Sequence, residues 1–256
     1  LNAGIDQDFK ITPEQLDEAI TPQTKVLLLN SPNNPSGSVF TEKELAELAK
    51  VLEKHPHVFV ISDEIYEYIV YEDPHHSIAS FPGMKDRVVI VNGVSKGFSM
   101  TGWRIGYIAA PEWIASACSR LQGQYTSGAC GISQKATLAA INGPLDETRA
   151  MIDAFHHRRE LVLKLASEIP GLKTNHPEGA FYLFPNVSHF FGKSYNGKTI
   201  KNAADLSFYL LEEAYVATVS GTAFGNENCI RFSYASSDKL LTEAMRRIKE
   251  ALARLD

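Results

Sequence analysis

The sequence predicts an α/β fold with a mainly parallel sheet in a large first domain and a smaller α/β domain after it. Short apolar runs alternate with helical patterns through the first half of the chain, which is typical of βαβ units. The 256 residues, 44% of them hydrophobic and 21% charged, are enough for two globular domains. We place the large domain at residues 1–155 and the small domain at residues 156–256.

Two capping boxes and several apolar runs define the elements of the first half. Thr12 and Thr41 are each followed three residues later by Gln or Glu, the pattern that begins a helix. Runs rich in β-branched residues predict strands between and after these helices. In order, we expect a helix over 12–20, a strand over 25–30, a helix over 41–54 and strands over 58–62, 87–92 and 104–109.

The second half begins with a helical pattern over residues 111–169, broken at Gly143 and Pro144. The last part of this pattern, about 147–169, is expected to link the two domains. It is followed by expected strands over 180–184 and 229–234 and by expected helices near 202–214 and 238–254. This alternation of strands and helices indicates that the small domain is also α/β.

Charge and composition exclude several classes of partner. The net charge of −5 argues against nucleic acid or an anionic membrane, since either favours clustered Lys and Arg. The longest apolar runs are strand-sized and too short to span a bilayer. The three cysteines lack CxxC spacing, and the pairs His75-His76 and His156-His157 have no third ligand at a metal-binding spacing. We therefore predict no metal, no nucleic acid and no membrane partner.

Polar residues follow two of the predicted strands. Asp63 and Tyr66 come after the second strand, at the carboxyl end where open α/β sheets bind ligands; a plain helix N-cap is the alternative for Asp63. Lys96 follows the third strand in NGVSKGFSMTGWRIG, whose small residues let the backbone approach a ligand. An enclosed lysine serves as a Schiff-base nucleophile or a general base. Arg104 adds a cation that can bind a phosphate, or else it forms a surface ion pair.

Three motifs occur in a fixed order: SPNNPSG from Ser31, ISDEIYEYIVY from Ile61 and NGVSKGFSMTGWRIGY from Asn92, followed by PEGAFYLFP and GTAFGNENCIRFSYA. In order and spacing they resemble the class I aminotransferases of the aspartate aminotransferase group, and the resemblance covers essentially the whole chain. It implies fold type I of the pyridoxal-phosphate enzymes, with pyridoxal 5'-phosphate as the cofactor. Since several features of that family precede these motifs, we expect an N-terminal part upstream of Leu1.

The resemblance implies roles for four residues at the cofactor. Lys96 would form the Schiff base and carry the proton between substrate and cofactor. Asp63 would keep the pyridine nitrogen protonated. Asn34 and Tyr66 would donate hydrogen bonds to the phenolic oxygen and favour its anionic form.

The same resemblance assigns the phosphate and the substrate carboxylate to other residues. Arg104 and Ser95 would bind the phosphate; Ser95 is a substitute, because Gly93 occupies the position at which some branches carry a serine. Arg231 would bind the substrate α-carboxylate through two parallel hydrogen bonds, with Asn34 as a second substrate contact. The alternative for Arg231 is an arginine exposed at the edge of a strand. The alternative for Asn34 is a plain Asn-Pro turn.

As the activity, the resemblance implies transamination of an L-amino acid, with aspartate as the expected donor and 2-oxoglutarate as the acceptor. The alternatives are a β-lyase, a prephenate or aromatic aminotransferase, and a non-catalytic regulatory domain. The intact protein is expected to be a cytoplasmic homodimer. Trp103, Phe181 and Tyr182 either line the site or belong to the core.

Overall fold

The computed structural model describes all residues from 1 to 256, and the chain divides into two compact units. The first unit consists of Leu1, Ile11–Asn33 and Val39–Ile152. The second unit consists of Asn2–Lys10, Asn34–Ser38 and Asp153–Asp256. The boundary at residue 152 falls inside one long helix, α5 (Asp146–Ser167), which therefore belongs to both units.

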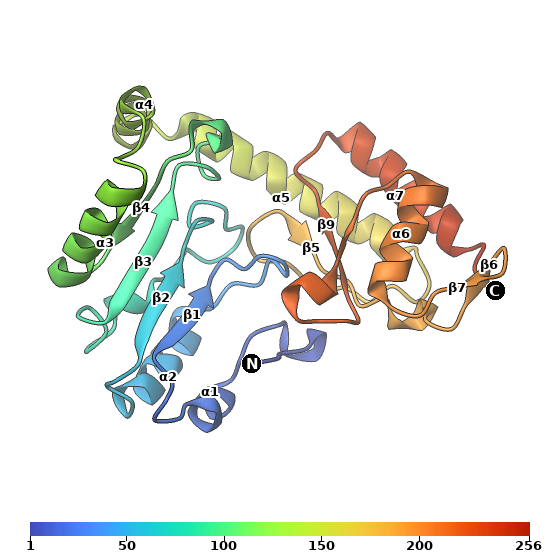
Figure 1. The fold of residues 1–256 in the computed structure, drawn as a ribbon. Coiled ribbons are helices and arrows are strands. Elements are labelled where there is room, and N and C mark those ends of the chain that lie inside the picture. Colours follow the sequence, from blue (N-terminus) through green and yellow to red (C-terminus); the bar gives the residue numbers. More distant parts are fainter. The chain divides into compact units, whose positions relative to one another are not determined.

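A four-stranded sheet forms the centre of the first unit (Figure 1). Its strands, in spatial order, are β1 (Val26–Asn30), β2 (Phe59–Asp63), β3 (Val88–Gly93) and β4 (Gly106–Ala109). The first three strands are parallel, and β4 is antiparallel to β3. Asn30 pairs with Asp63, which pairs with Val91, so the parallel strands end at a common edge. The predicted mainly parallel sheet is confirmed.

Helices of the first unit begin where the sequence places caps. Both capping boxes are present, since the hydroxyls of Thr12 and Thr41 each accept a hydrogen bond from the third residue of the helix that follows. Leu48 and Leu52 of the second of these helices are buried in one apolar cluster with Val60 of β2. The helices and short turns of this unit are α1 (Pro13–Ala19), α2 (Glu42–Glu53), η2 (Ile78–Ser80), η3 (Thr101–Trp103), α3 (Glu112–Tyr125) and α4 (Gly131–Asn142).

The second unit is built around a three-stranded antiparallel sheet in the order β5-β9-β8. Its core contains Leu183 of the sheet together with Leu206, Leu210 and Ile248 from two helices. The strands are β5 (Tyr182–Leu183), β8 (Val219–Ser220) and β9 (Ile230–Ser233), with a separate hairpin of β6 (Ser194–Tyr195) and β7 (Lys198–Thr199). The helices and turns are η1 (Ile5–Gln7), η4 (Ser188–Phe190), α6 (Ala203–Ala214), η5 (Gly221–Phe224) and α7 (Asp238–Leu252).

The structure departs from the expected elements in several places, and the short strands β6, β7 and β8 were not expected. The helical pattern over 111–169 has a second break at residues 126–130, where Ser127 is left-handed with a φ of 62°. The fourth strand begins at Gly106 and not at residue 104, because Arg104 is also left-handed, with a φ of 56°. The strand expected over 180–184 has only two residues, Tyr182 and Leu183, and Ala180 lies before it with a left-handed φ of 54°.

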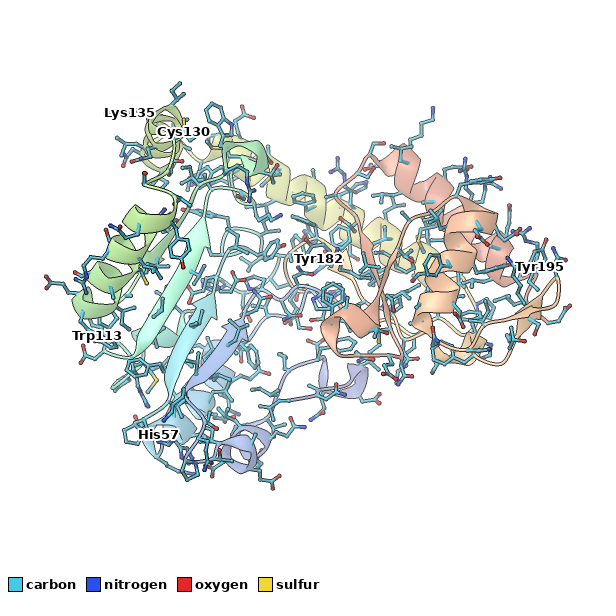
Figure 2. All side chains as sticks on the ribbon, in the orientation of Figure 1. His57, Trp113, Cys130, Lys135, Tyr182 and Tyr195 are labelled. Atoms are coloured by element: carbon cyan, nitrogen blue, oxygen red, sulfur yellow. The ribbon has the colours of Figure 1, made fainter.

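Much apolar surface of the first unit is exposed. All four residues of β4 are exposed, and α3 buries none of its residues. Trp113 at the start of α3 (labelled in Figure 2) is 62% exposed, and Leu28 on β1 is 69% exposed. Exposed apolar area of this extent is typical of a surface that contacts other protein segments or a ligand. The length and apolar content of the helices leave none of them as a candidate membrane-spanning segment.

Candidate active site

The end of β2 provides a carboxylate and a phenol. Asp63 is the last residue of the strand and is half-buried; its Oδ1 accepts a hydrogen bond of 3.3 Å from the N–H of Ile65. Burial raises the pKa of Asp63, the bond from Ile65 opposes this, and the neighbouring Glu64 carboxylate raises it further. Tyr66 lies in the turn that follows and is only 3% exposed. Because burial disfavours the charged form of this carboxyl, a cationic partner would stabilise the carboxylate.

The end of β3 provides the amine. Lys96 is half-buried in a turn after this strand, and its Nζ lies 6.0 Å from the centroid of the Tyr66 ring. Asp63 pairs with Val91 in the sheet, so both chain segments leave the same edge. The structure therefore brings three predicted site residues together: a carboxylate, a phenol and an amine at the carboxyl ends of two adjacent parallel strands.

The turn that carries Lys96 is held from both ends. Oδ1 of Asn92 accepts a hydrogen bond of 2.7 Å from the N–H of Gly93. The buried hydroxyl of Thr148, near the start of α5, donates to the carbonyl oxygen of Gly97 at 3.1 Å. A Cβ on Gly97 would lie 2.7 Å from the ring of Tyr68, so this position accepts only glycine without rearrangement. These contacts fix the backbone on each side of Lys96.

The two residues assigned to a phosphate lie on the same connection between β3 and β4. Ser95 precedes Lys96 in the turn and is half-buried. Arg104 is exposed at the end of η3, and its Nη1 donates to the carbonyl oxygen of Thr101 at 3.0 Å. The left-handed backbone of Arg104 thus ends one turn and begins β4, which explains why a strand pattern alone misplaced this residue.

The other two predicted residues, Asn34 and Arg231, are in contact within the second unit. Nη1 of Arg231, on β9, donates to Oδ1 of Asn34 at 2.7 Å, although 197 residues separate them. The guanidinium carbon of Arg231 lies 4.6 Å from the centroid of Tyr182 and 4.9 Å from that of Phe224. Tyr182 is on β5 and is labelled in Figure 2. Arg231 is therefore held by two aromatic rings and one amide.

Asn34 belongs to the second unit because its loop is bonded to that unit. Nδ2 of Asn175 donates to the carbonyl oxygen of Ser36 at 3.1 Å. The N–H of Gly179 donates to the carbonyl oxygen of Gly37 at 2.8 Å. Gly37 has a φ of +72°, and a Cβ there would lie 2.5 Å from Pro177, so the close approach requires glycine. Asn34 and Arg231 consequently form one local group.

Several residues of these two groups were not predicted. Phe224 was not singled out, because an aromatic residue after a glycine-rich turn is more often part of the core. Thr148 lies 51 residues from Gly97, and nothing in its local sequence distinguishes it from any helix-start threonine. His75 was considered only as a metal ligand, whereas its ring bonds Glu64. Long-range partners of this kind have no local sequence signal.

The parallel sheet and the strand-end group are those of an α/β protein with a candidate ligand site at the carboxyl edge of the sheet. Residues 3–248 match the family described as aminotransferase class I and II. The chain belongs to this family, and the predicted family and fold type are confirmed.

Relatives of this chain carry related names. A bifunctional aspartate aminotransferase and glutamate/aspartate-prephenate aminotransferase from Petunia hybrida is 47% identical over 98% of this chain and 54% of its own length. An aspartate/prephenate aminotransferase from Cereibacter sphaeroides is 44% identical over 99% of this chain and 64% of its own length. The chain thus spans between 54% and 64% of these two relatives.

Two solved structures show the same fold. The crystal structure of the aspartate aminotransferase from Rhizobium meliloti has a TM-score of 0.96 and 43% identity, covering 100% of this chain and 65% of that one. The aromatic aminotransferase from Pyrococcus horikoshii has a TM-score of 0.91 and 37% identity, covering 98% of this chain and 66% of that one. The fold is therefore common to aminotransferases with different names.

The close packing of Gly97 predicts that Gly97→Ala is destabilising. The new methyl group must displace the Tyr68 ring, and overpacking of this kind costs about 1–3 kcal/mol. Gly102→Ala is the matched control, because a Cβ at Gly102 meets no atom within 4 Å. Urea titrations of both variants measure the difference in unfolding free energy. Equal midpoints for the two variants would contradict the packing described for this turn.

Proposed function

We propose that the protein is a pyridoxal-phosphate-dependent aminotransferase that exchanges the amino group of an L-amino acid, with aspartate as the main donor, with 2-oxoglutarate. The observation that carries this proposal is the group of Asp63, Tyr66 and Lys96 at one edge of the parallel sheet. Its relatives from Petunia hybrida and Cereibacter sphaeroides, both named for aspartate, support the donor.

The residues present fit pyridoxal phosphate. The cofactor has a basic ring nitrogen, a phenolic oxygen, an aldehyde and a phosphate, and each needs a different partner. Asp63 supplies a carboxylate for the nitrogen, and its half-buried position, which raises its pKa, favours a cationic partner. Tyr66 supplies a hydroxyl for the phenolic oxygen, and Lys96 supplies an amine for the aldehyde. Arg104 and Ser95 are the residues we propose for the phosphate.

When bound, the cofactor supplies the electron sink that stabilises negative charge at the substrate α-carbon. Lys96 would hold the cofactor and then move the proton from that carbon to the cofactor. Asp63 keeps the proton on the ring nitrogen, and Tyr66 with Asn34 hydrogen-bonds the phenolic oxygen. In this way the chain's own groups orient the cofactor and move one proton.

Arg231 is the proposed partner of the substrate α-carboxylate, together with Asn34. A guanidinium offers two parallel N–H groups that match the two oxygens of a carboxylate. The rings of Tyr182 and Phe224 limit the orientations of the Arg231 side chain before substrate arrives. A pre-oriented fork loses less conformational entropy on binding.

Prephenate transamination is the second candidate, because both curated relatives described above include prephenate in their names. The two functions differ in the 2-oxo acid that accepts the amino group. Comparing kcat/KM for 2-oxoglutarate and prephenate, with aspartate as the donor, distinguishes them. A β-lyase would release ammonia, and a regulatory domain would bind the cofactor without turnover.

We also propose that the intact protein is a homodimer and acts in the cytoplasm. The apolar surface exposed on β4, α3 and α4 fits this proposal, since symmetric dimers bury surfaces of this kind, and the part of the relatives' length that this chain does not span would cover surface of the same kind. All three cysteines are free thiols, and two of them are exposed, which suits a reducing compartment.

Lys96→Ala should abolish the covalent link to the cofactor. Borohydride reduction of the wild-type protein with pyridoxal phosphate, followed by peptide mass spectrometry, should locate the adduct on Lys96. Activity of the variant should fall by at least about a hundredfold, the lower end of what a positioned general acid-base contributes. Lys43→Ala, which changes an exposed lysine on α2, serves as the control. A wild-type adduct that lies on a lysine other than Lys96, and that persists at that site in Lys96→Ala, contradicts the assignment.

Arg231→Lys should weaken amino acid binding while leaving cofactor binding unchanged. An ammonium replaces two parallel bonds with a point charge, so we expect KM for the donor to rise about 10- to 100-fold. Arg246→Lys is the matched control, because Arg246 forms exposed ion pairs on α7. Steady-state kinetics and a cofactor titration separate the two effects. If cofactor affinity falls and KM stays constant, Arg231 does not bind the carboxylate.

A charge on the exposed apolar surface should dissociate the proposed dimer. Ile132 on α4 is 76% exposed, and Ile132→Glu would place a carboxylate within the contact. Leu240→Glu is the control, since Leu240 is 61% exposed on α7 of the second unit. Light scattering of the intact protein should give twice the chain mass for wild type and control and a lower mass for Ile132→Glu. A monomeric wild type rules out the dimer.

A further inference from the structure

A buried carboxylate lies beside the end of β2. Glu64 follows Asp63 directly, and its side chain is only 4% exposed. Oε1 of Glu64 accepts hydrogen bonds from the hydroxyls of Ser62 at 2.8 Å and Ser77 at 2.6 Å. Its Oε2 lies 2.9 Å from Nε2 of His75. Because a carboxylate accepts in all three contacts, we assign the Nε2–H tautomer to His75.

This hydrogen-bond network closes a loop. The bond between Glu64 and His75 joins the ends of residues 64–75, and Ser77 adds a second bond to the same carboxylate. Tyr66 lies inside the closed loop, where its carbonyl oxygen accepts a bond of 2.7 Å from the N–H of Ile69. The carboxylate therefore holds the base of the segment that presents the Tyr66 phenol.

The same loop also touches the Lys96 turn. The ring of Tyr68 occupies the space beside Gly97, and it packs edge-on against Phe98 with 5.2 Å between ring centroids. A displacement of the loop would therefore change the position of Tyr66 directly. It would also change the position of Lys96, through the contact of Tyr68 with Gly97.

Stability alone does not account for this network. Replacing a buried ionic or polar pair by apolar side chains is often neutral or stabilising, since desolvation opposes the attraction. Nδ1 of His75 is also buried without a hydrogen-bond partner, which is a further unfavourable contribution. What three directional bonds provide, and apolar packing does not, is a single fixed geometry.

We propose that Glu64, His75 and Ser77 form a clasp that positions Tyr66, and through it the phenolic oxygen of the bound cofactor. The clasp residues touch neither cofactor nor substrate, so they are positioning residues. This inference rests on the proposed function for its cofactor part and on the loop geometry alone for the rest.

The first test uses the cofactor-free protein. Hydrogen exchange followed by mass spectrometry measures the amides of residues 65–69 in wild type, His75→Ala and His76→Ala. Loss of the clasp should speed exchange of this segment by about tenfold or more, while the neighbouring His76→Ala has no effect. His75→Gln, whose amide retains an N–H near the position of Nε2, should restore slow exchange. Equal exchange rates of residues 65–69 in all four proteins would contradict the proposed clasp.

The second test uses the cofactor-bound protein. The pH at which the visible absorption of bound pyridoxal phosphate changes should rise in His75→Ala, as it should in Tyr66→Phe, because both remove a hydrogen bond from the phenolic oxygen. If His75 acts through Tyr66, the shift in the double variant should equal that of Tyr66→Phe and not the sum. Additive shifts, or no shift in His75→Ala, contradict positioning through Tyr66.

A second variant and a comparison of outcomes separate the clasp from the proposed function. Should His75→Ala not fold, Ser77→Ala is held to the same outcomes; it removes the 2.6 Å bond to Glu64 together with the 3.3 Å bond that the Ser77 hydroxyl accepts from the N–H of Ala79. A wild-type protein that forms no adduct at Lys96 refutes the proposed function. The exchange experiment still tests the clasp, because it uses the cofactor-free protein. An adduct at Lys96 with unchanged exchange and spectra refutes the clasp alone.

Discussion

The common end of three parallel strands is the constraint on which the rest of the first unit depends. Asn30, Asp63 and Val91 are paired across the sheet, so every connection that leaves β1, β2 or β3 starts from one edge. Side chains that are distant in sequence then meet without any element of their own to align them. Lys96 approaches the Tyr66 ring to 6.0 Å because both lie within five residues of that paired row. Backbone hydrogen bonding, not side-chain attraction, brings them together.

Strand ends alone do not fix the side chains that they carry. The turns after β2 and β3 leave the sheet, so their geometry depends on polar contacts from outside the ladder. Glu64 holds the first turn, whereas Asn92 and Thr148 hold the second. Each of these polar groups is buried, and a buried polar group that loses its partner costs about 1–3 kcal/mol. The turns that carry Tyr66 and Lys96 are therefore held by polar groups that are not among the predicted site residues.

The difference between what the sequence predicted and what it missed follows from the range of the interactions. Local patterns determine the strands, the helix caps and the strand-end positions of Asp63 and Lys96. Such patterns can be recognised in a single sequence. The left-handed backbone of Arg104 is also local, but its β-like neighbours concealed it. The contact of Arg231 with Asn34 spans 197 residues, and only the family resemblance linked the two. The role of those residues in a site stays a prediction.

The surroundings of Arg231 bear on its proposed role as the partner of a substrate carboxylate. The rings of Tyr182 and Phe224 attract the guanidinium but accept no conventional hydrogen bond, so they orient it without occupying its N–H groups. Asn34 accepts one bond as a neutral amide. Hydrogen bonds to charged partners contribute about 1.5–3 kcal/mol, against about 1 kcal/mol for neutral ones. In the proposed role of Arg231, a substrate carboxylate would therefore outcompete or add to the amide at a guanidinium that the two rings already orient.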